Sequence, residues 1–188
     1  MAEYNWISDD IFTVSAFLSP AECDDHIRHA EGHGFSAAPI NTMLGQQVRS
    51  DVRNNTRVML DDRAIANDLW ARAKEYVGGS LNGWDPIGVN ERMRFYRYES
   101  GQQFDWHRDG AFVRNSSERS QLTFMVYLND DFDGGETSFE DVSVVPERGL
   151  ALFFVHKLLH KGQPVTRDRK YVLRTDVMYR RAAGDPAP

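Results

Sequence analysis

The chain has 188 residues, of which 41% are hydrophobic, and its formal net charge is −6 at pH 7. This length and apolar fraction predict one globular domain, while the acidic balance disfavours a nucleic-acid-binding protein. There is no long apolar run and no charged-then-apolar leader, and Cys23 is the single cysteine, so we expect no membrane segment, no intrachain disulfide and a cytoplasmic location.

The first part of the sequence predicts a strand followed by a capped helix. Residues 11–18 are apolar and partly alternating, as in a strand. Ser19, Pro20 and Glu22 then form the pattern of a capping box, with serine at the N-cap, proline at the first helical position and glutamate at the third. We therefore expect a helix that begins at Pro20 and ends at the next glycines in the sequence.

A second helix is predicted after a polar segment. Residues 36–54 show little periodicity and predict a long surface loop, and residues 56–60 predict a short strand. Within residues 62–77, apolar side chains recur every four positions, at Ile65, Leu69, Ala73 and Val77. This spacing places them on one helical face, so we expect that face to pack against the core.

After Asn90 the sequence turns to short strand candidates separated by turn residues. The candidates are 91–98, 103–109, 120–128, 135–140, 149–155, 160–166 and 169–179. Such spacing is typical of a sandwich or barrel, with the earlier helices packed against it. The predicted class is α+β, mainly β, in one domain over residues 1–181. Residues 182–188 are small, polar and proline-rich and predict a disordered tail.

A candidate metal site begins at His107 and Asp109, two residues apart on a predicted strand. Side chains at this spacing point to the same face of a strand. A third ligand from a distant strand would complete a two-histidine, one-carboxylate triad, which suits non-heme Fe(II). That ligand is His156 or His160, and we favour His160 because it stands at the head of a predicted strand.

The triplet around His107 also matches a protein-kinase catalytic loop, but the rest of the sequence does not. A kinase places an asparagine five residues after the aspartate, whereas Asn115 is six residues after Asp109. No glycine-rich loop followed by a lysine-bearing strand is present, and 188 residues are too few for a kinase domain. We therefore exclude a kinase.

A resemblance to a known family rests on four segments taken in order: RMRFYRYESGQQFDWHRDG, TFMVYLNDDFDGGETSF, GLALFF and HKGQPVTRDRKYVL. Their sequence and spacing resemble the Fe(II)- and 2-oxoglutarate-dependent dioxygenases, most closely the prolyl 4-hydroxylase branch. The resemblance implies a double-stranded β-helix (jelly-roll) core over residues 91–179, supported by a helix-containing part over residues 1–90. It also implies Fe(II), 2-oxoglutarate and O2, with ascorbate as a reductant.

The resemblance further implies site residues. The iron ligands would be His107, Asp109 and His160. Tyr98 and Tyr127 match tyrosines that contact 2-oxoglutarate, and Lys170 matches the basic residue that pairs with its distal carboxylate. Some branches of the superfamily take this basic residue from a later position, which leaves Arg174 as an alternative, and Arg169 as a weaker one.

The register of a predicted hairpin also favours Lys170. If strands 160–166 and 169–179 pair through a turn at residues 167–168, residue 170 faces about residue 165. Lys170 then lies several residues along the ladder from the metal, within reach of a bound five-carbon diacid, and Arg174 falls back near His160. Lys170, Val172 and Arg174 share a strand face, and an inward basic pair requires an anion.

The implied reaction is hydroxylation of an unactivated C–H bond, in a prolyl residue or another amino acid, with release of succinate and CO2. Candidate substrate residues are Arg94, Tyr96 and Arg57. Arg49, Arg53 and Arg57, with Arg94 and Arg174 at the mouth of the site, are compatible with an acidic or carboxylate-bearing substrate, although we favour a solvated basic surface as the explanation of these arginines. The substrate would be a peptide, a protein or a small amino-acid-like molecule, and the sequence indicates no oligomeric state.

Two other functions are compatible with parts of this pattern. A nucleic-acid demethylase of the same superfamily is disfavoured by the acidic balance and by the lack of a basic, aromatic-interleaved patch. A non-catalytic β-barrel binding module is disfavoured because candidates for all three metal ligands are present.

Overall fold

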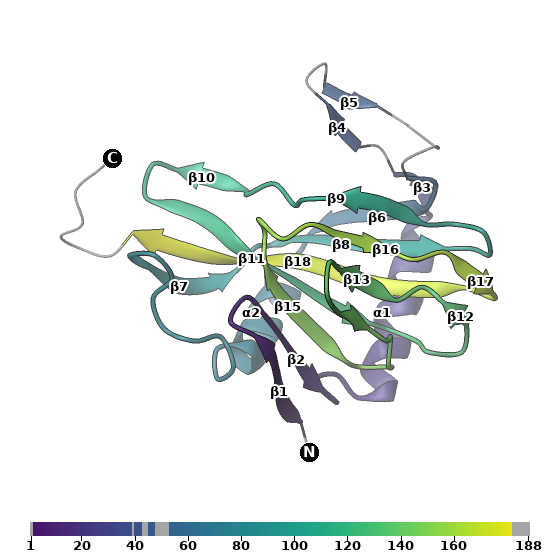
Figure 1. The fold of residues 1–188 in the computed structure, drawn as a ribbon, viewed down its shortest axis with the longest axis horizontal. Coiled ribbons are helices and arrows are strands. Elements are labelled where there is room, and N and C mark those ends of the chain that lie inside the picture. Colours follow the sequence, from purple (N-terminus) through teal and green to yellow (C-terminus); the bar gives the residue numbers. More distant parts are fainter. Residues whose placement is uncertain (1, 39, 43–44, 48–52, 182–188) are drawn as a thin grey trace.

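The computed structural model describes residues 2–38, 40–42, 45–47 and 53–181, and in these ranges the protein forms two helices and many short antiparallel strands (Figure 1). The helices are α1 (Pro20–His33) and α2 (Arg63–Ala73). The α+β, mainly β, class is therefore confirmed. Neither helix of the described part is long and apolar enough to cross a membrane.

A large antiparallel sheet forms the centre of the molecule. Its strands, in spatial order, are β1 (Glu3–Ser8), β2 (Ile11–Ser15), β15 (Ala151–Val155), β11 (Glu118–Tyr127), β18 (Lys170–Arg181), β8 (Arg92–Tyr98), β6 (Thr56–Asp61) and β3 (Ser36–Ala37). Two further strands extend it, β10 (Val113–Asn115) beside β11 and β7 (Trp84–Val89) beside β18.

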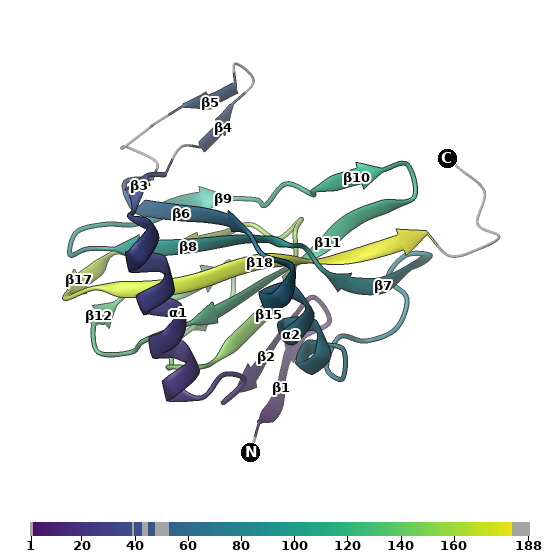
Figure 2. The ribbon, with the colours of Figure 1, turned by 180° about the vertical axis from the view of Figure 1, so that it is seen from behind.

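A small sheet lies against one face of the large sheet. Its order is β14 (Ser143–Val144), β13 (Thr137–Phe139), β16 (His160–Gly162) and β9 (Phe104–His107). Two separate ladders join β12 (Asp133–Gly134) to β17 (Val165–Arg167) and β4 (Ile40–Thr42) to β5 (Gly45–Gln47). Both helices cover the opposite face of the large sheet (Figure 2). This is the predicted jelly-roll arrangement with supporting helices.

Alternation along the strands divides the core into two layers. On β8, Met93 and Phe95 belong to the cluster beneath the helices, whereas Tyr96 and Tyr98 belong to the cluster between the sheets. On β11, Phe124 and Tyr127 divide in the same way. The period of two therefore aims one face of each central strand at the helices and the other at the small sheet.

The helix boundaries follow the capping residues. The hydroxyl of Ser19 accepts a hydrogen bond from the Glu22 amide at 3.3 Å, and the Glu22 carboxylate accepts one from the Ser19 amide at 2.8 Å. This is the predicted capping box, and α1 ends just before Gly34, which has φ 76°. The second helix stops at Ala73, earlier than predicted, although Val77 is still buried beyond it.

Several strands lie where none was predicted. β3, β4 and β5 occupy the segment predicted as a loop, β1 precedes the predicted first strand, and β7 contains Pro86 and Gly88, which weaken a strand pattern. Backbone hydrogen bonds to neighbouring strands form them, and a hydrophobic pattern does not report such pairing, although Trp84 and Val89 of β7 are buried in the core.

The predicted hairpin at residues 167–168 is wrong. The segment predicted as one strand over residues 160–166 is two strands, β16 in the small sheet and β17 paired with β12, and neither pairs with β18. At Asp168, which has φ 60°, the backbone instead crosses from this layer to the large sheet. The hairpin register therefore cannot position Lys170. The predicted disordered tail, residues 182–188, lies outside the described residues.

Candidate metal centre and anion pocket

Two histidines face each other across the small sheet. His107 is the last residue of β9 and His160 the first of β16, and the two are Cα partners in the antiparallel ladder. Asp109 lies two residues beyond the end of β9, so the strand face invoked from the sequence stops short of it. Its carboxylate nevertheless comes within 3.9 Å of His107 Nε2 and 3.7 Å of His160 Nε2.

The ligand atoms of these three residues all lie within 4.8 Å of one another. Among the residues that the structure describes, this is the group of histidine, cysteine or carboxylate side chains arranged to hold a metal ion. His156, the alternative third ligand, does not belong to it. The triad predicted from the sequence is thus brought together in space.

The hydrogen bonds of both histidines prepare them as metal ligands. His107 Nδ1 lies 2.7 Å from the Asp105 carbonyl, and His160 Nδ1 lies 3.0 Å from the Leu158 carbonyl. Because a carbonyl can only accept, both Nδ1 atoms carry the proton, and both Nε2 lone pairs are free to face Asp109. A hydrogen bond from the ring nitrogen that does not bind the metal commonly orients a metal-bound imidazole.

Burial and neighbouring charge keep this site in the protonation state that a metal requires. Burial, together with the nearby His160, lowers the pKa of His107 to about 3. Burial also lowers the pKa of His160. Burial alone would raise the pKa of Asp109, but the positive charge of Arg174 and the two histidines outweigh it and hold that pKa well below its usual range. Neutral imidazoles and an ionised carboxylate are the forms that bind metal ions.

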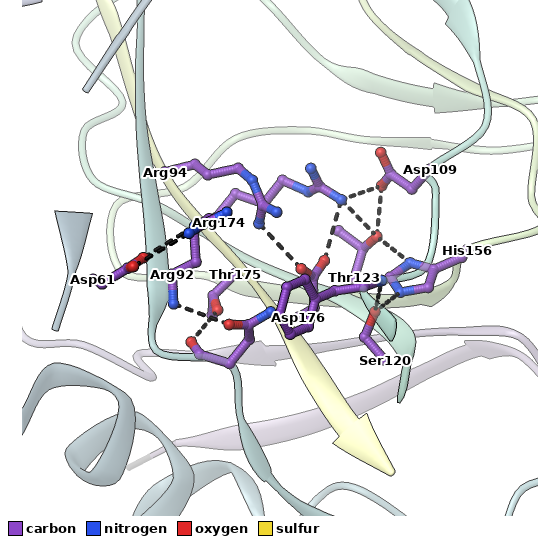
Figure 3. A network of polar contacts seen from close by, with 12 residues as sticks. Asp61, Arg92, Arg94, Asp109, Ser120, Thr123, His156, Arg174, Thr175 and Asp176 are labelled. Atoms are coloured by element: carbon purple, nitrogen blue, oxygen red, sulfur yellow. Dashed lines mark hydrogen bonds and ion pairs between the residues drawn. The ribbon is translucent and has the colours of Figure 1, made fainter. Parts of the chain in front are cut away.

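A series of hydrogen bonds supports Asp109 from β11 (Figure 3). The Thr123 hydroxyl donates to Asp109 Oδ2 at 2.5 Å, so it must accept from His156 Nδ1, which lies 3.0 Å away. His156 Nε2 then accepts from the Ser120 hydroxyl at 2.8 Å. His156 is buried and turns away from the metal triad. Its function in this geometry is to orient Thr123.

Two arginines and a buried aspartate lie beneath the same carboxylate (Figure 3). Arg174 Nη2 is 3.0 Å from Asp109 Oδ2 and 3.2 Å from Asp176 Oδ1. Asp176, only 1% exposed, also receives Arg94 Nη1 at 3.1 Å. Sequence reasoning had placed Arg94 near the substrate, but its guanidinium is paired with Asp176 below the pocket.

A pocket between the two sheets joins the triad to Lys170. Lys170 is 3% exposed, and its ammonium donates to the Gly135 carbonyl and lies 5.4 Å and 5.1 Å from the ring centroids of Tyr98 and Tyr127. Burial lowers its pKa to about 7, against a smaller opposing effect of Glu136. A buried, half-protonated lysine with no carboxylate bonded to it is suited to receive an anion.

Of the two tyrosines near Lys170, Tyr98 lines this end of the pocket, whereas Tyr127 is fully buried and does not line it. The Tyr127 hydroxyl donates to the Thr137 hydroxyl at 2.7 Å, and burial raises the pKa of Tyr98 to about 12, so both phenols are neutral donors. Arg169, the weaker alternative anchor, points outward to Glu99 Oε1 at 2.8 Å and lies outside the pocket. Lys170 and Arg174 both line it, four residues apart on β18 and so about 13 Å apart along the strand.

The remaining candidate substrate residues lie on β6, on β8 and in the segment before β6. Tyr96 lines the pocket, and Arg57 is half-buried as its Cα partner on β6. Arg53 is 5% exposed and therefore not part of a solvated basic surface, whereas Arg49 lies outside the described residues. No role of these arginines toward a substrate follows from geometry alone, so those roles stay predictions.

Sequence reasoning missed how the site is supported. Asp176 pairs with Arg174, and Gly135 accepts from Lys170, but neither was a candidate site residue. His156 was considered only as a metal ligand, whereas its imidazole bonds to Thr123, which in turn bonds to Asp109. No local pattern in the sequence indicates that His156 and Asp176 lie beside Thr123 of β11.

Comparisons with known proteins agree with this geometry. Residues 93–175 match the family model described as the 2OG-Fe(II) oxygenase superfamily. The protein named "Probable prolyl 4-hydroxylase 7" of Arabidopsis thaliana is 30% identical over 196 residues, which cover 86% of this chain and 60% of that protein. The chain spans 60%, 66% and 65% of the lengths of three such Arabidopsis relatives, less than two thirds of each.

Solved structures show the same fold. A viral collagen prolyl hydroxylase from Paramecium Bursaria Chlorella virus-1, solved with 2OG, has a TM-score of 0.63 at 21% identity, covering 92% of this chain and 97% of that one. A Trichoplax adhaerens prolyl hydroxylase was solved with a peptide fragment of the hypoxia-inducible factor oxygen degradation domain. It has a TM-score of 0.68 at 15% identity, and the match covers 90% of this chain and 84% of that one.

Proposed function

Because residues 93–175 match the 2OG-Fe(II) oxygenase superfamily and the chain is similar to prolyl 4-hydroxylases, we propose that it is a member of this superfamily, in its prolyl 4-hydroxylase-like branch, and an Fe(II)- and 2-oxoglutarate-dependent hydroxylase. The reaction would insert one oxygen atom of O2 into an unactivated C–H bond and release succinate and CO2. The observation that carries this proposal is the joint presence, in one pocket, of a metal triad and a buried lysine that has no carboxylate partner among the described residues.

The residues present fit Fe(II). Two neutral imidazoles with free Nε2 atoms and one ionised carboxylate are the donor set of the facial triad, which leaves coordination positions open on one side. His107, Asp109 and His160 would hold the ion. When bound, Fe(II) supplies the oxidative chemistry, as cofactors generally do, while the protein supplies geometry.

Lys170, Tyr98 and Tyr127 would hold the distal carboxylate of 2-oxoglutarate. A protonated Lys170 offers a charge-assisted hydrogen bond and the Tyr98 phenol a neutral one, whereas the single hydroxyl proton of Tyr127 would have to turn from Thr137 to the carboxylate. The pocket is walled by apolar side chains, including Val172, Phe154 and Met125, which exclude water around the bound diacid. Low polarity strengthens the attraction between the lysine and the carboxylate.

The protein's own residues then keep the reacting end fixed. Phe104 stacks on the His107 ring with centroids 3.5 Å apart, and Thr123 fixes one oxygen of Asp109. A rigidly held triad would fix the position of the metal relative to one C–H bond of the substrate. We propose a prolyl residue or another amino acid as that substrate, with ascorbate as a reductant of the iron and the cytoplasm as the location. The similarity to prolyl 4-hydroxylases supports this substrate class, and the lone buried Cys23 is compatible with a cytoplasmic location.

Two measurements test the proposal. Calorimetry should show metal-dependent binding of 2-oxoglutarate, and a screen of free amino acids and proline-containing peptides should show succinate release together with a product heavier by one oxygen atom. Metal-dependent 2-oxoglutarate binding without any product would favour a binding module. Failure to bind either metal or 2-oxoglutarate would exclude the proposed function.

A further inference from the structure

A buried cationic corner lies next to the metal triad, beside the pocket that also holds Lys170. We define the cationic corner as Arg53, Tyr96, Phe104 and Arg174. Tyr96, Phe104 and Arg174 line the pocket. The Arg53 guanidinium is stacked between two of them, with its central carbon 4.4 Å from the Tyr96 ring centroid and 4.3 Å from that of Phe104. Phe104 in turn stacks on the metal ligand His107.

Arg53 is held in place before any ligand arrives. Its backbone forms a β-bridge with Phe104, and its Nε donates to the Asn55 side-chain oxygen at 2.6 Å. Its Nη2 is buried without a hydrogen-bond partner in the described part of the protein. A buried guanidinium nitrogen without a partner is costly unless a ligand completes it. The geometry therefore leaves a donor unused beside the pocket.

The charges of the corner are also unbalanced. Arg53, Arg94 and Arg174 surround the Tyr96 hydroxyl, and although burial raises the pKa of Tyr96, these positive charges lower it to about 8. Among the described residues, the carboxylates paired with these arginines are Asp176 and Asp109. Asp109 would be shared with a divalent cation once the triad is occupied. In the described part of the protein the three arginines then outnumber the carboxylates that face them, and an anion would neutralise the excess positive charge.

We propose that the cationic corner binds a carboxylate of the hydroxylated substrate. This inference rests on the proposed function and adds to it the class of substrate. Lys170 provides for the distal carboxylate of 2-oxoglutarate, and the metal held by the triad would take its other carboxylate. A further anion site beside the triad is then left for another molecule. Arginine presents a planar fork that matches a carboxylate, and its stacking on two rings fixes the plane of that fork.

The consequence concerns which molecules can react. An internal residue of a peptide has no α-carboxylate to offer, whereas a free amino acid or the C-terminal residue of a peptide has one. The substrate class would therefore be a free amino acid or the C-terminal end of a peptide. Direct contact of the carboxylate with the corner, next to the triad, would bring a C–H bond in the side group of the same residue close to the metal.

Matched probes that differ only at the carboxylate test this proposal. The full-length protein is loaded with Zn2+, which is redox-inert, and with 2-oxoglutarate. Dissociation constants are then measured by calorimetry for L-proline and L-prolinamide, for N-acetyl-L-proline and its amide, and for the other L-amino acids and their amides. For at least one pair we expect the acid to bind about tenfold or more tightly than the amide, as loss of a charged hydrogen bond implies.

Variants then assign the preference to the corner. In Arg53→Met the acid should lose about tenfold in affinity, the amide should not change, and 2-oxoglutarate should bind within about twofold of wild type. Arg53→Lys keeps the positive charge but lacks the planar guanidinium, so its affinity for the acid should lie between those of wild type and Arg53→Met. Arg92→Met is the charge-matched control, because Arg92 pairs with Asp61 at the exposed end of β8; its acid-to-amide ratio should stay at the wild-type value.

The outcomes separate this inference from the proposed function. Equal binding of acid and amide in every wild-type pair overturns it, and that measurement does not depend on any variant folding. A loss of 2-oxoglutarate affinity in Arg53→Met with an unchanged acid-to-amide ratio also overturns it, because the corner would then serve the cosubstrate. In either case metal-dependent 2-oxoglutarate binding and succinate release would leave the proposed function standing.

Discussion

Thr123 donates its hydroxyl proton to the Asp109 carboxylate over 2.5 Å, and it can do so because His156 donates to it from the other side. Thr123→Val keeps the shape of this residue and removes the bond. We expect metal affinity to fall about 10- to 100-fold, the usual cost of losing such an outer hydrogen bond. Titration of the wild type and the variant with Mn2+ or Zn2+ measures this loss of metal affinity.

The control for this variant is Thr123→Ser, which retains the hydroxyl and should keep most of the affinity. His156→Phe should weaken metal binding less than Thr123→Val, because it removes only the group that orients Thr123. Metal affinity that is equal in Thr123→Val and wild type would show that the bond to Asp109 has no part in holding the ion.

His160 and His156 can be distinguished directly as third ligands. His160→Ala removes one of three donor atoms and should reduce metal affinity by at least about 100-fold, since a triad with one ligand missing no longer surrounds the ion. His33→Ala, on the exposed end of α1, is the matched control and should bind metal as wild type does. Retained tight binding in His160→Ala would assign the third ligand elsewhere.

Lys170 predicts the pH dependence of cosubstrate binding. Its ordinary pKa of 10.5 is lowered to about 7 by burial, so above pH 7 the free protein holds mostly neutral lysine. A dianionic ligand needs the protonated form. Affinity for 2-oxoglutarate should therefore fall above pH 7, by up to about tenfold per pH unit, and binding at pH 8 should take up close to one proton.

Calorimetry in buffers of different ionisation enthalpy measures this proton uptake. Lys170→Arg carries a permanent charge, so its binding should vary little with pH over the same range. The lowered pKa of Lys170 also affects the stability of the free protein. Between about pH 7 and 10.5 the unfolded state binds the lysine proton and the folded state does not, so the free energy of unfolding should rise with pH over this range. Proton release on binding would contradict this assignment of Lys170.

Arg94 and Arg92 lie on the same strand, but the ion pair of Arg94 is largely buried and that of Arg92 is exposed. Arg94→Met leaves Asp176, which is 1% exposed, with Arg174 as its remaining cationic partner, and should cost about 2–4 kcal/mol of unfolding free energy. Arg92→Met breaks an ion pair with Asp61 in which the side chains are 43% and 58% exposed, and should cost less than about 1 kcal/mol. Urea denaturation compares the two, and equal costs would argue against a buried network.

Gly135 gives a test of how Lys170 is held. A Cβ at Gly135 would lie 3.1 Å from Lys170 Cδ, whereas one at Gly101 would meet nothing within 4 Å, although both residues have positive φ. Gly135→Ala and Gly101→Ala should therefore share a backbone strain of about 1 kcal/mol. Only Gly135→Ala should weaken 2-oxoglutarate binding, because it displaces the lysine. Similar binding in both variants would mean that Lys170 tolerates the shift.

The sequence was most informative where a local rule fixes the outcome. The capping box at Ser19 depends on a few neighbouring residues, and the helix start followed from it. His107, Asp109 and His160 were found because their types and spacing match a known ligand pattern. Lys170 was assigned by resemblance and lies in the pocket.

What could not be predicted depends on contacts between distant strands. Nothing near His160 reveals that β16 pairs with β9 and β13 rather than with β18, so the hairpin argument for Lys170 failed although its conclusion about the residue agrees with the pocket. Arg53 falls in a segment without a local pattern, and its burial results from Tyr96 and Phe104, more than 40 residues away.

The two sheets divide the chemistry of the pocket. The histidines of the metal triad stand on the small sheet, at His107 and His160, whereas Lys170, Arg174 and Tyr96 stand on the large one. Substitutions on β8 and β18 can therefore alter the preferred organic acids while the histidine ligands are left intact. A designer seeking a new substrate could vary the large sheet alone, and related proteins could have diverged in specificity by the same route.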